Sequence, residues 1–108
     1  MGPGKAALLE AIVDAGSISA AARNMKMSYR RAWMLVDVMN RSFKEPLVHS
    51  VAGGRQGGGA SVTDAGRHVL AQYRALEQAA LTAAQGRLTT LVMLLADPAE
   101  IDPKNRHG

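Results

Sequence analysis

Residues 16–43, GSISAAARNMKMSYRRAWMLVDVMNRSF, decide the fold of this 108-residue chain. Residues 18–24 and residues 29–42 each have the composition of a helix, and residues 24–27 form a tight turn between them. The three alanines of residues 20–22 allow another helix to approach closely. Two helices joined by such a turn predict a helix-turn-helix.

Serines stand where both helices begin. Ser17 or Ser19 caps the first helix and Ser28 caps the second, because a serine hydroxyl accepts a hydrogen bond from a free N–H group of the first turn. Lys26 falls where many such turns carry glycine. We therefore expect either an uncommon backbone angle at Lys26 or a slightly longer turn.

The start of the second helix presents groups that can read DNA. Its buried face is predicted from apolar residues at helical spacing: Ala32, Leu35, Val36 and Met39. The groups left on its exposed N-terminal surface are Tyr29, Arg30, Arg31, Trp33 and Met34. A recognition helix contacts base edges with its N-terminal residues, and arginine can bind guanine through two hydrogen bonds. Two alternatives stay open, an ordinary solvated face for the arginines and a core anchor for Trp33.

The segments around this stretch complete a winged module. Residues 4–15 have one apolar stripe and predict a helix that Gly16 ends. Residues 47–51 predict a strand and residues 61–63 its returning partner, with five glycines around Arg55 and Gln56 between them. A hairpin of this kind fits a wing that contacts DNA, and a flexible linker is the alternative. The glycines lack the spacing of a phosphate-binding loop.

Residues 64–85 predict a long helix that Thr63 caps. Apolar residues recur along it at spacings of four and three: Val69, Tyr73, Leu76, Ala80 and Ala83. Such a seam favours pairing with a second copy, and packing against residues 4–15 is the alternative. We expect the first turns of this helix to pack against residues 4–15 and its later turns to pair with the second copy.

We expect Gly86 to interrupt this helix and residues 87–96 to form a short fifth helix. The predicted domain organisation is a winged helix-turn-helix with its dimerisation helix in residues 1–86, followed by the short helix and a disordered tail in residues 87–108. The fold class is therefore mainly α, with three helices, a two-stranded wing and a long C-terminal dimerisation helix.

The charge of the chain is uneven. Its net charge is +4, from 13 Lys and Arg against 9 Asp and Glu. Residues 1–60 hold eight Lys or Arg and four Asp or Glu, whereas residues 61–108 hold five of each. A net charge of +4 is ordinary for a small protein, but its location with the helix-turn-helix pattern favours a polyanion as the partner.

Several classes of function are excluded. The sequence has no cysteine, which rules out disulfides, thiolate metal sites and cysteine nucleophiles. It has no nucleophile–base pair, no paired carboxylates and no histidines at metal-ligand spacing, so we predict no catalytic residue, metal or cofactor, and no enzyme. The longest apolar run, residues 91–96, is too short to cross a bilayer. We expect a cytoplasmic protein without a membrane partner.

Three segments resemble the N-terminal DNA-binding domain of the ModE family of molybdate-responsive regulators, a relative of the LysR-type winged helix-turn-helix. They are residues 16–22, the MSYRRAW run of residues 27–33 with Asp37, Met39 and Asn40, and the glycines of residues 53–59 with Val62, Thr63 and Gly66. The MSYRRAW run is the most specific of the three.

The resemblance implies a homodimer that places two recognition helices in successive major grooves of a near-palindromic site in double-stranded DNA. By position, it implies groove-facing roles for residues 28–31 and a wing-tip role for Arg55. The complete set of candidate DNA-binding residues is Ser17, Lys26, Ser28, Tyr29, Arg30, Arg31, Trp33, Met34, Arg55 and Gln56.

The leading hypothesis is a sequence-specific DNA-binding transcriptional regulator that acts as a homodimer. ModE proteins sense molybdate through C-terminal domains that these 108 residues lack, so we expect no molybdate binding by this chain, although a link to molybdenum genes stays open. The alternative hypothesis is a dimerisation or adaptor protein that modulates a full-length regulator without reading DNA.

Overall fold

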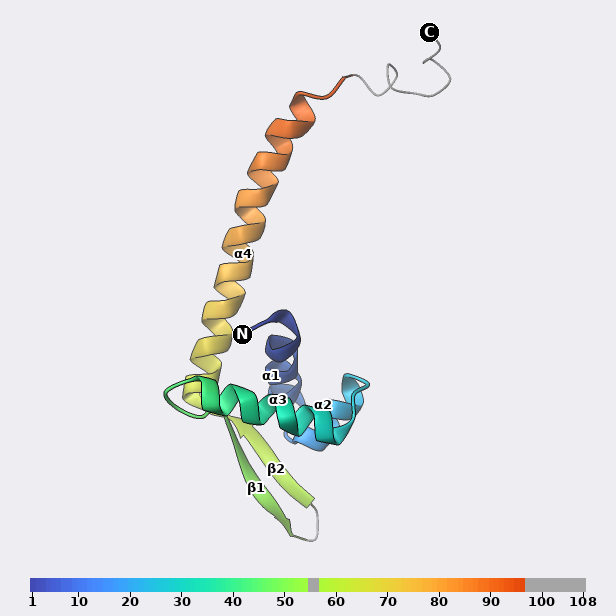
Figure 1. The fold of residues 1–108 in the computed structure, drawn as a ribbon, viewed down its shortest axis with the longest axis vertical. Coiled ribbons are helices and arrows are strands. Elements are labelled where there is room, and N and C mark those ends of the chain that lie inside the picture. The colour runs from blue at the N-terminus through green and yellow to red at the C-terminus, as the bar shows by residue number, and fades with distance from the viewer. Residues whose placement is uncertain (55–56, 97–108) are drawn as a thin grey trace. The chain divides into compact units, whose positions relative to one another are not determined.

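The computed structural model describes residues 1–54 and 57–96. Within these residues the chain forms four helices and a two-stranded sheet (Figure 1). The elements are α1 (Pro3–Ala15), α2 (Ile18–Asn24), α3 (Tyr29–Ser42), β1 (Val48–Gly54), β2 (Gly57–Val62) and α4 (Asp64–Met93). The chain divides into two compact units, residues 1–75 and residues 76–108, and each is described by itself.

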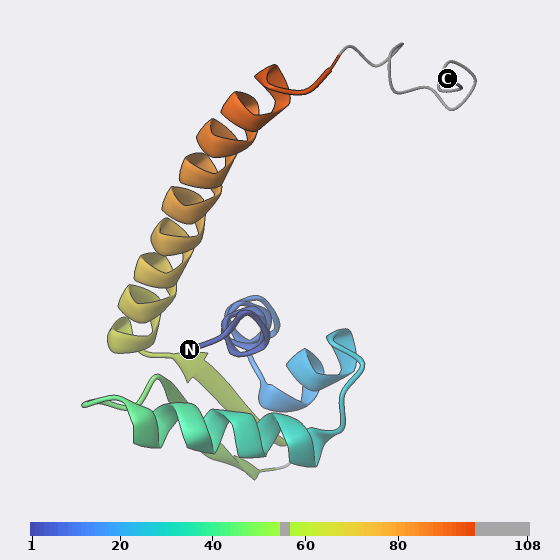
Figure 2. The ribbon, with the colours of Figure 1, turned by 45° about the horizontal axis from the view of Figure 1, so that its top comes forward.

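The core of the first unit lies where α1, α2 and α3 meet, as Figure 2 shows with α1 seen end-on. Its largest fully buried side chains are Leu8, Leu9, Ile12, Val36, Met39 and Leu47. The small residues Ala21 and Ala22 are buried at the crossing of the helices, which confirms the predicted close approach. Three residues of the predicted buried face of α3 are buried, and the fourth, Leu35, is half-buried against the same core.

Local signals set the ends of these helices. Gly16 ends α1 with a φ of 74°, a left-handed conformation that glycine adopts readily. Ser17 caps α2 by accepting a hydrogen bond from the Ala20 N–H at 3.0 Å, and Ser28 caps α3 by accepting one from the Arg31 N–H at 3.1 Å. Pro3 is the first residue of α1, a position where its missing N–H is not needed.

The two strands form an antiparallel hairpin. Val48 pairs with Val62 and Val51 with Gly59, and the register shifts between Val51 and Gly54 before Gly54 pairs with Gly57. The strands therefore extend further into the glycine-rich segment than the sequence predicted. The Ala60 N–H donates to the Gly16 carbonyl at 3.0 Å, which ties β2 to the turn between α1 and α2.

The start of α4 packs closely on the base of the wing. Thr63 Oγ1 accepts a hydrogen bond from the Gly66 N–H at 3.0 Å, which confirms the predicted cap, and it also donates to the Pro46 carbonyl at 2.7 Å. A Cβ on Gly66 would lie 2.3 Å from the Leu47 carbonyl oxygen and 2.6 Å from Val62 Cγ1. Only glycine fits at this contact without a shift of the backbone.

The predicted interruption at Gly86 is wrong, and residues 87–93 belong to α4 instead of forming a separate fifth helix. The helix runs without a break from Asp64 to Met93. A glycine inside a helix costs only about 1 kcal/mol relative to alanine, and the neighbouring Ala83, Ala84 and Leu88 favour a helix. The predicted division after residue 86 stays a prediction, and the predicted tail of residues 97–108 lies outside the described residues.

Candidate nucleic-acid interface

The turn between α2 and α3 presents a lysine in an unusual conformation. Lys26 has a φ of 57°, and its side chain is exposed. This confirms the first of the two expectations for the turn, an uncommon backbone angle at Lys26. Met25 and Met27, on either side, are half-buried against the core, so apolar packing holds the turn in place while the lysine faces solvent.

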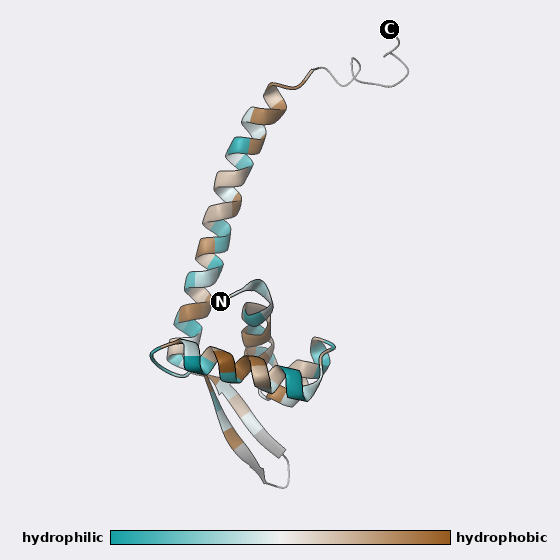
Figure 3. Ribbon diagram, in the orientation of Figure 1, coloured by the Kyte–Doolittle hydropathy of each residue, from teal (hydrophilic) through white to brown (hydrophobic). Residues whose placement is uncertain are grey.

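The first turn of α3 gathers the strongest candidates. Tyr29, Arg30 and Arg31 are all exposed, and Tyr29 exposes 53% of its surface. Figure 3 shows the beginning of α3 as strongly hydrophilic, in contrast to the hydrophobic middle of the helix. The N-terminus of a helix carries partial positive charge and free N–H groups, which favour phosphates. Arg30 and Arg31 add two full positive charges to the partial positive charge of this helix end.

Trp33 lies behind this surface. It is half-buried and packs against the core, which supports the core-anchor alternative. Its ring also meets the Tyr29 ring edge to face, with centroids 6.3 Å apart and planes at 78°. An aromatic pair in this geometry stabilises the orientation of both rings. Trp33 therefore supports Tyr29 from within, and direct contact of Trp33 with DNA stays a prediction.

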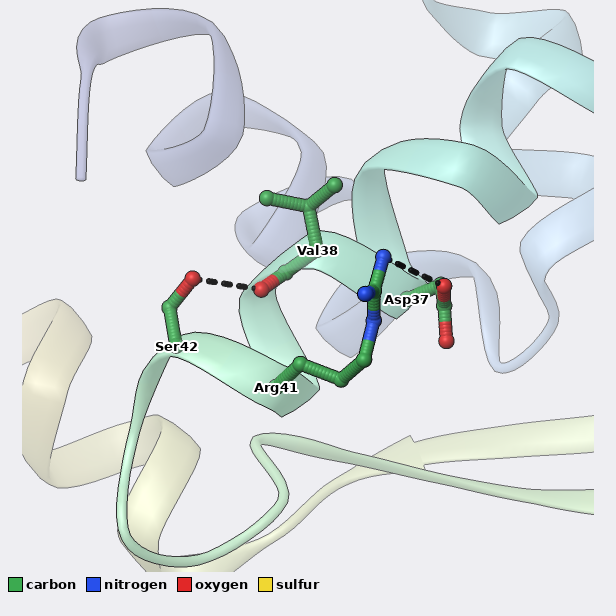
Figure 4. Close-up of polar contacts among 4 residues, drawn as sticks. All are labelled: Asp37, Val38, Arg41 and Ser42. Carbon is green, nitrogen blue, oxygen red and sulfur yellow. Dashed lines mark hydrogen bonds and ion pairs between the residues drawn. The ribbon is translucent and has the colours of Figure 1, made fainter.

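An outward stripe runs the length of α3 through four exposed residues: Arg30, Met34, Asp37 and Arg41. Met34 exposes 57% of its surface. Asp37 forms an ion pair with Arg41 at 3.0 Å, and Ser42 Oγ donates to the Val38 carbonyl at 2.6 Å (Figure 4). The pair leaves the second half of the stripe close to neutral. The positive charge of the stripe that has no partner among the described contacts therefore lies at the start of the helix, on Arg30.

The two serines among the predicted DNA contacts also have structural roles. The hydroxyls of Ser17 and Ser28 both accept capping bonds, and Ser17 is half-buried whereas Ser28 is exposed. Arg23 of α2 was not predicted from the sequence as a contact. It is exposed, and its Nη1 donates to Ser19 Oγ at 3.1 Å. Its place in the last turn of α2, just before Lys26, was the available signal.

The wing has two distinct faces. Val48, Ala60 and Val62 are buried, whereas His49, Val51 and Ser61 point outward and are exposed. His49 pairs with Ser61 across the hairpin, so the outer face is polar at its base. Arg55 and Gln56, the predicted wing contacts, lie outside the described residues.

Asn40 anchors the wing, a role that was not predicted from the sequence. Its Oδ1 accepts hydrogen bonds from the N–H groups of Leu47 at 2.8 Å and Val48 at 3.0 Å, and its Nδ2 donates to the Val48 carbonyl at 3.1 Å. Asparagine is a poor helix former that readily bonds to nearby backbone. Its presence in the last turn of a helix just before a strand was the signal available in the sequence.

The predicted dimerisation seam divides between the two units. In the first unit Val69 and Tyr73 are half-buried, and Arg74 of α4 forms an ion pair with Glu10 of α1. The predicted packing of the first turns of α4 near α1 is therefore supported. In the second unit Leu76, Ala80 and Ala83 are exposed, and Leu76 exposes 65% of its surface. Their pairing with a second copy stays a prediction.

Residues 1–54 and 57–96 do not present the features of a metal site or of a membrane span. These residues contain no cluster of three His, Cys, Asp or Glu side chains able to hold a metal ion, and no charged or polar side chain among them is buried. None of their helices has the length and apolar character needed to span a bilayer.

Together these features define a winged helix-turn-helix, with a capped basic helix beside a β-hairpin. The chain belongs to the family described as bacterial regulatory helix-turn-helix protein, lysR family, whose pattern matches residues 5–67. The match covers α1, α2, α3, the wing and the first turn of α4.

Two proteins named ModE are similar to this chain over 70 and 76 residues. The chain is 57% identical over 70 residues to the molybdenum transport protein ModE of Azotobacter vinelandii, a match that covers 65% of this chain and 26% of that protein. It is 37% identical over 76 residues to the DNA-binding transcriptional dual regulator ModE of Escherichia coli K12, covering 70% of this chain and 29% of that protein. The chain thus spans less than a third of these relatives and matches their N-terminal DNA-binding domain.

Solved structures share the fold at low sequence identity. The CbnR_DBD–DNA complex superposes with a TM-score of 0.61 at 21% identity, covering 83% of this chain and 99% of that chain. The regulator LysG of Corynebacterium glutamicum with bound effector superposes with a TM-score of 0.57 at 21% identity, covering 88% of this chain and 30% of that chain. The predicted winged helix-turn-helix is confirmed.

Proposed function

We propose that this chain is a sequence-specific DNA-binding transcriptional regulator that acts as a homodimer in the cytoplasm and has no enzymatic activity. The observation that carries the proposal is the exposed surface at the capped start of α3, where Tyr29, Arg30 and Arg31 stand together. Lys26 adds a positive charge from the preceding turn. This surface offers arginine for guanine and several groups for phosphates.

The proposed interface consists of the recognition surface and the wing. Ser28 and residues 29–31 would enter the major groove, with Met34 in position to contact a thymine methyl group. Arg55 and Gln56 would contact the backbone or the minor groove beside it. Two such modules joined through α4 would read two half-sites about one helical turn apart.

The experiment that tests the proposal is selection of duplexes from a random pool by the purified chain. We expect an enriched near-palindromic sequence, since a two-fold symmetric dimer reads the same half-site twice. Recovery of no enriched sequence would contradict sequence-specific binding. If no sequence were enriched and a longer homologue co-purified with the chain, the adaptor hypothesis would replace the proposal of sequence-specific binding.

A role in molybdenum metabolism is part of the proposal, whereas molybdate sensing by these residues is not. The relative from Azotobacter vinelandii is named a molybdenum transport protein, but an oxyanion site needs converging polar groups, and no polar side chain is buried in residues 1–54 and 57–96. We expect the enriched sequence and its affinity to be the same with and without molybdate. A shift in affinity on adding molybdate would contradict this part.

A further inference from the structure

We propose that Asn40 is a positioning residue that sets the orientation of the wing relative to the recognition helix. The proposal rests on the proposed function for its DNA measurements alone, because the contact itself lies within the first unit. Asn40 stands near the end of α3, and its amide makes three hydrogen bonds to Leu47 and Val48 at the start of β1.

The amide of Asn40 takes the place of a neighbouring strand. It pairs with both the N–H and the carbonyl of Val48, the two groups that a strand presents together toward one side. The other side of Val48 faces β2, where it is opposite Val62. The edge of β1 is thus closed at its base by a side chain from α3, and the Leu47 N–H is satisfied by the same oxygen.

Two further tethers hold the base of the wing, but they come from other elements. The Gly16 carbonyl, which accepts from Ala60, precedes α2, and Thr63, which donates to the Pro46 carbonyl, precedes α4. Asn40 belongs to α3 itself. It therefore transmits the position of the recognition helix directly to the hairpin.

The position of the far end of the wing is sensitive to small rotations at this contact. Asn40 stands eleven residues after Tyr29, which places it about 16 Å along the helix from the reading surface. β1 has seven residues and extends about 23 Å. A swing of roughly 10° at its base would move its far end by about 4 Å, which exceeds the tolerance of a hydrogen bond to phosphate. Loss of the tether should therefore remove wing contacts and leave those of α3 in place.

The test uses Asn40→Ala and Asn40→Leu, with Ser42→Ala as the matched control. Asn40→Leu keeps the branched shape and the number of side-chain heavy atoms and removes the amide, so it separates hydrogen bonding from packing. Ser42 lies two residues further along and bonds only within α3 among the described contacts. Affinity for the enriched duplex and its dependence on salt are measured well below the unfolding temperature of each variant.

We expect both Asn40 variants to bind the duplex about tenfold more weakly, with a salt slope smaller by about 1 per protomer, as for one lost phosphate contact. Hydroxyl-radical protection should weaken at the flanks and persist at the centre of each half-site. Arg55→Ala should weaken protection at the same flanking positions. A parent-like affinity and slope for both variants, or a uniform loss of protection across the site, would overturn the proposal.

Hydrogen exchange tests the same tether without DNA. In Asn40→Ala the amides of Leu47 and Val48 should exchange at least tenfold faster, while amides in the first half of α3 keep their parent rates. Asn40→Asp, which keeps the accepting oxygen, should restore much of that protection. Unchanged exchange at Leu47 and Val48 would overturn the proposal even if no duplex were enriched, whereas failure of enrichment alone would contradict the proposed function.

Discussion

At the scale of single residues, the proposed interface combines side chains that have structural roles with side chains that are proposed to read DNA. Ser28 caps α3 and Trp33 packs against the core. These two residues hold the backbone and the Tyr29 ring, whereas Arg30 and Arg31 are exposed and have no structural role of that kind in the described contacts. Substitution of the arginines should therefore alter binding without altering the fold.

Replacing Arg30 or Arg31 with alanine is expected to cost about 1–3 kcal/mol of DNA-binding free energy and to relax the preferred base at one position, if that arginine binds guanine through two hydrogen bonds. Alanine favours a helix, so thermal unfolding should stay close to that of the parent. Fluorescence anisotropy with matched and singly altered duplexes measures both effects. If both variants bound every duplex as the parent does, α3 would not be the recognition helix.

Gly66 gives a prediction about stability at the same scale. Gly66→Ala would force a Cβ to within 2.3 Å of the Leu47 carbonyl oxygen, so we expect a loss of about 2–4 kcal/mol in the free energy of unfolding. Gly86→Ala is the control, because nothing lies within 4 Å of a Cβ there and the change should leave the helix as stable or more stable by up to about 1 kcal/mol. Urea unfolding measures both. Equal stability of the Gly66 variant and the parent would contradict the close packing.

At the scale of elements, α3 is polarised along its length. Its start carries uncompensated positive charge, and its second half carries the ion pair of Asp37 and Arg41, whose side chains are 60% and 71% exposed. An exposed pair of this kind contributes little to stability. Its effect on the field near DNA is larger, because a carboxylate on the outward stripe repels phosphates.

Asp37→Asn is therefore expected to strengthen binding to all duplexes by about two- to threefold at low salt, with a smaller gain at high salt. Arg41→Gln should act in the opposite direction and is the matched control. Anisotropy titrations at several salt concentrations measure the change. Weaker binding of the enriched duplex alone in Asp37→Asn would mean that this carboxylate reads a base, such as the amino group of cytosine.

The elements also show what could be predicted from the sequence. Helix ends were predictable where the signal is local, as with Gly16, Ser28 and Thr63, because caps involve residues three or four positions apart. The length of α4 was mispredicted because one glycine was given more weight than its helix-forming neighbours. The extent of the strands depends on pairing across the hairpin, which local preferences for or against glycine do not reveal.

Some parts of the candidate site could likewise be predicted from the sequence, and others could not. The exposed group at the start of α3 followed from helical spacing, and the structure brings its members together. The place of Asn40 in the last turn of a helix indicated a bond to nearby backbone, but its partners could not be named in advance, because they are seven and eight residues away in an element whose position depends on the whole core. The alternatives for Trp33 also depended on tertiary packing.

At the scale of the whole molecule, function depends on the proposed pairing of two copies. In the proposed complex a single module would contact one half-site, and linking two modules would raise the affinity because the second contact becomes intramolecular. The binding should also weaken steeply with salt, since lysine and arginine contacts release counterions from DNA.

Leu76→Glu is expected to raise the dissociation constant of the dimer at least tenfold, because it places a charge on the predicted seam. Leu76 is exposed in the single chain, so the variant should remain folded. Leu81→Glu removes a similar side chain, exposed at 52%, away from that seam and is the matched control. Sedimentation velocity over a concentration series measures both. Equal weakening by the two variants would show that the seam has been assigned to the wrong face.

The left-handed backbone at Lys26 implies a compromise between stability and activity. A residue other than glycine adopts this conformation at a cost of about 1 kcal/mol, yet the position carries a lysine with φ of 57° beside the recognition helix. Lys26→Gly should therefore melt at a higher temperature and bind DNA more weakly, as thermal unfolding and anisotropy would show. In such a variant the melting temperature would rise while the affinity for DNA falls. A more stable turn would therefore be a weaker contact with DNA.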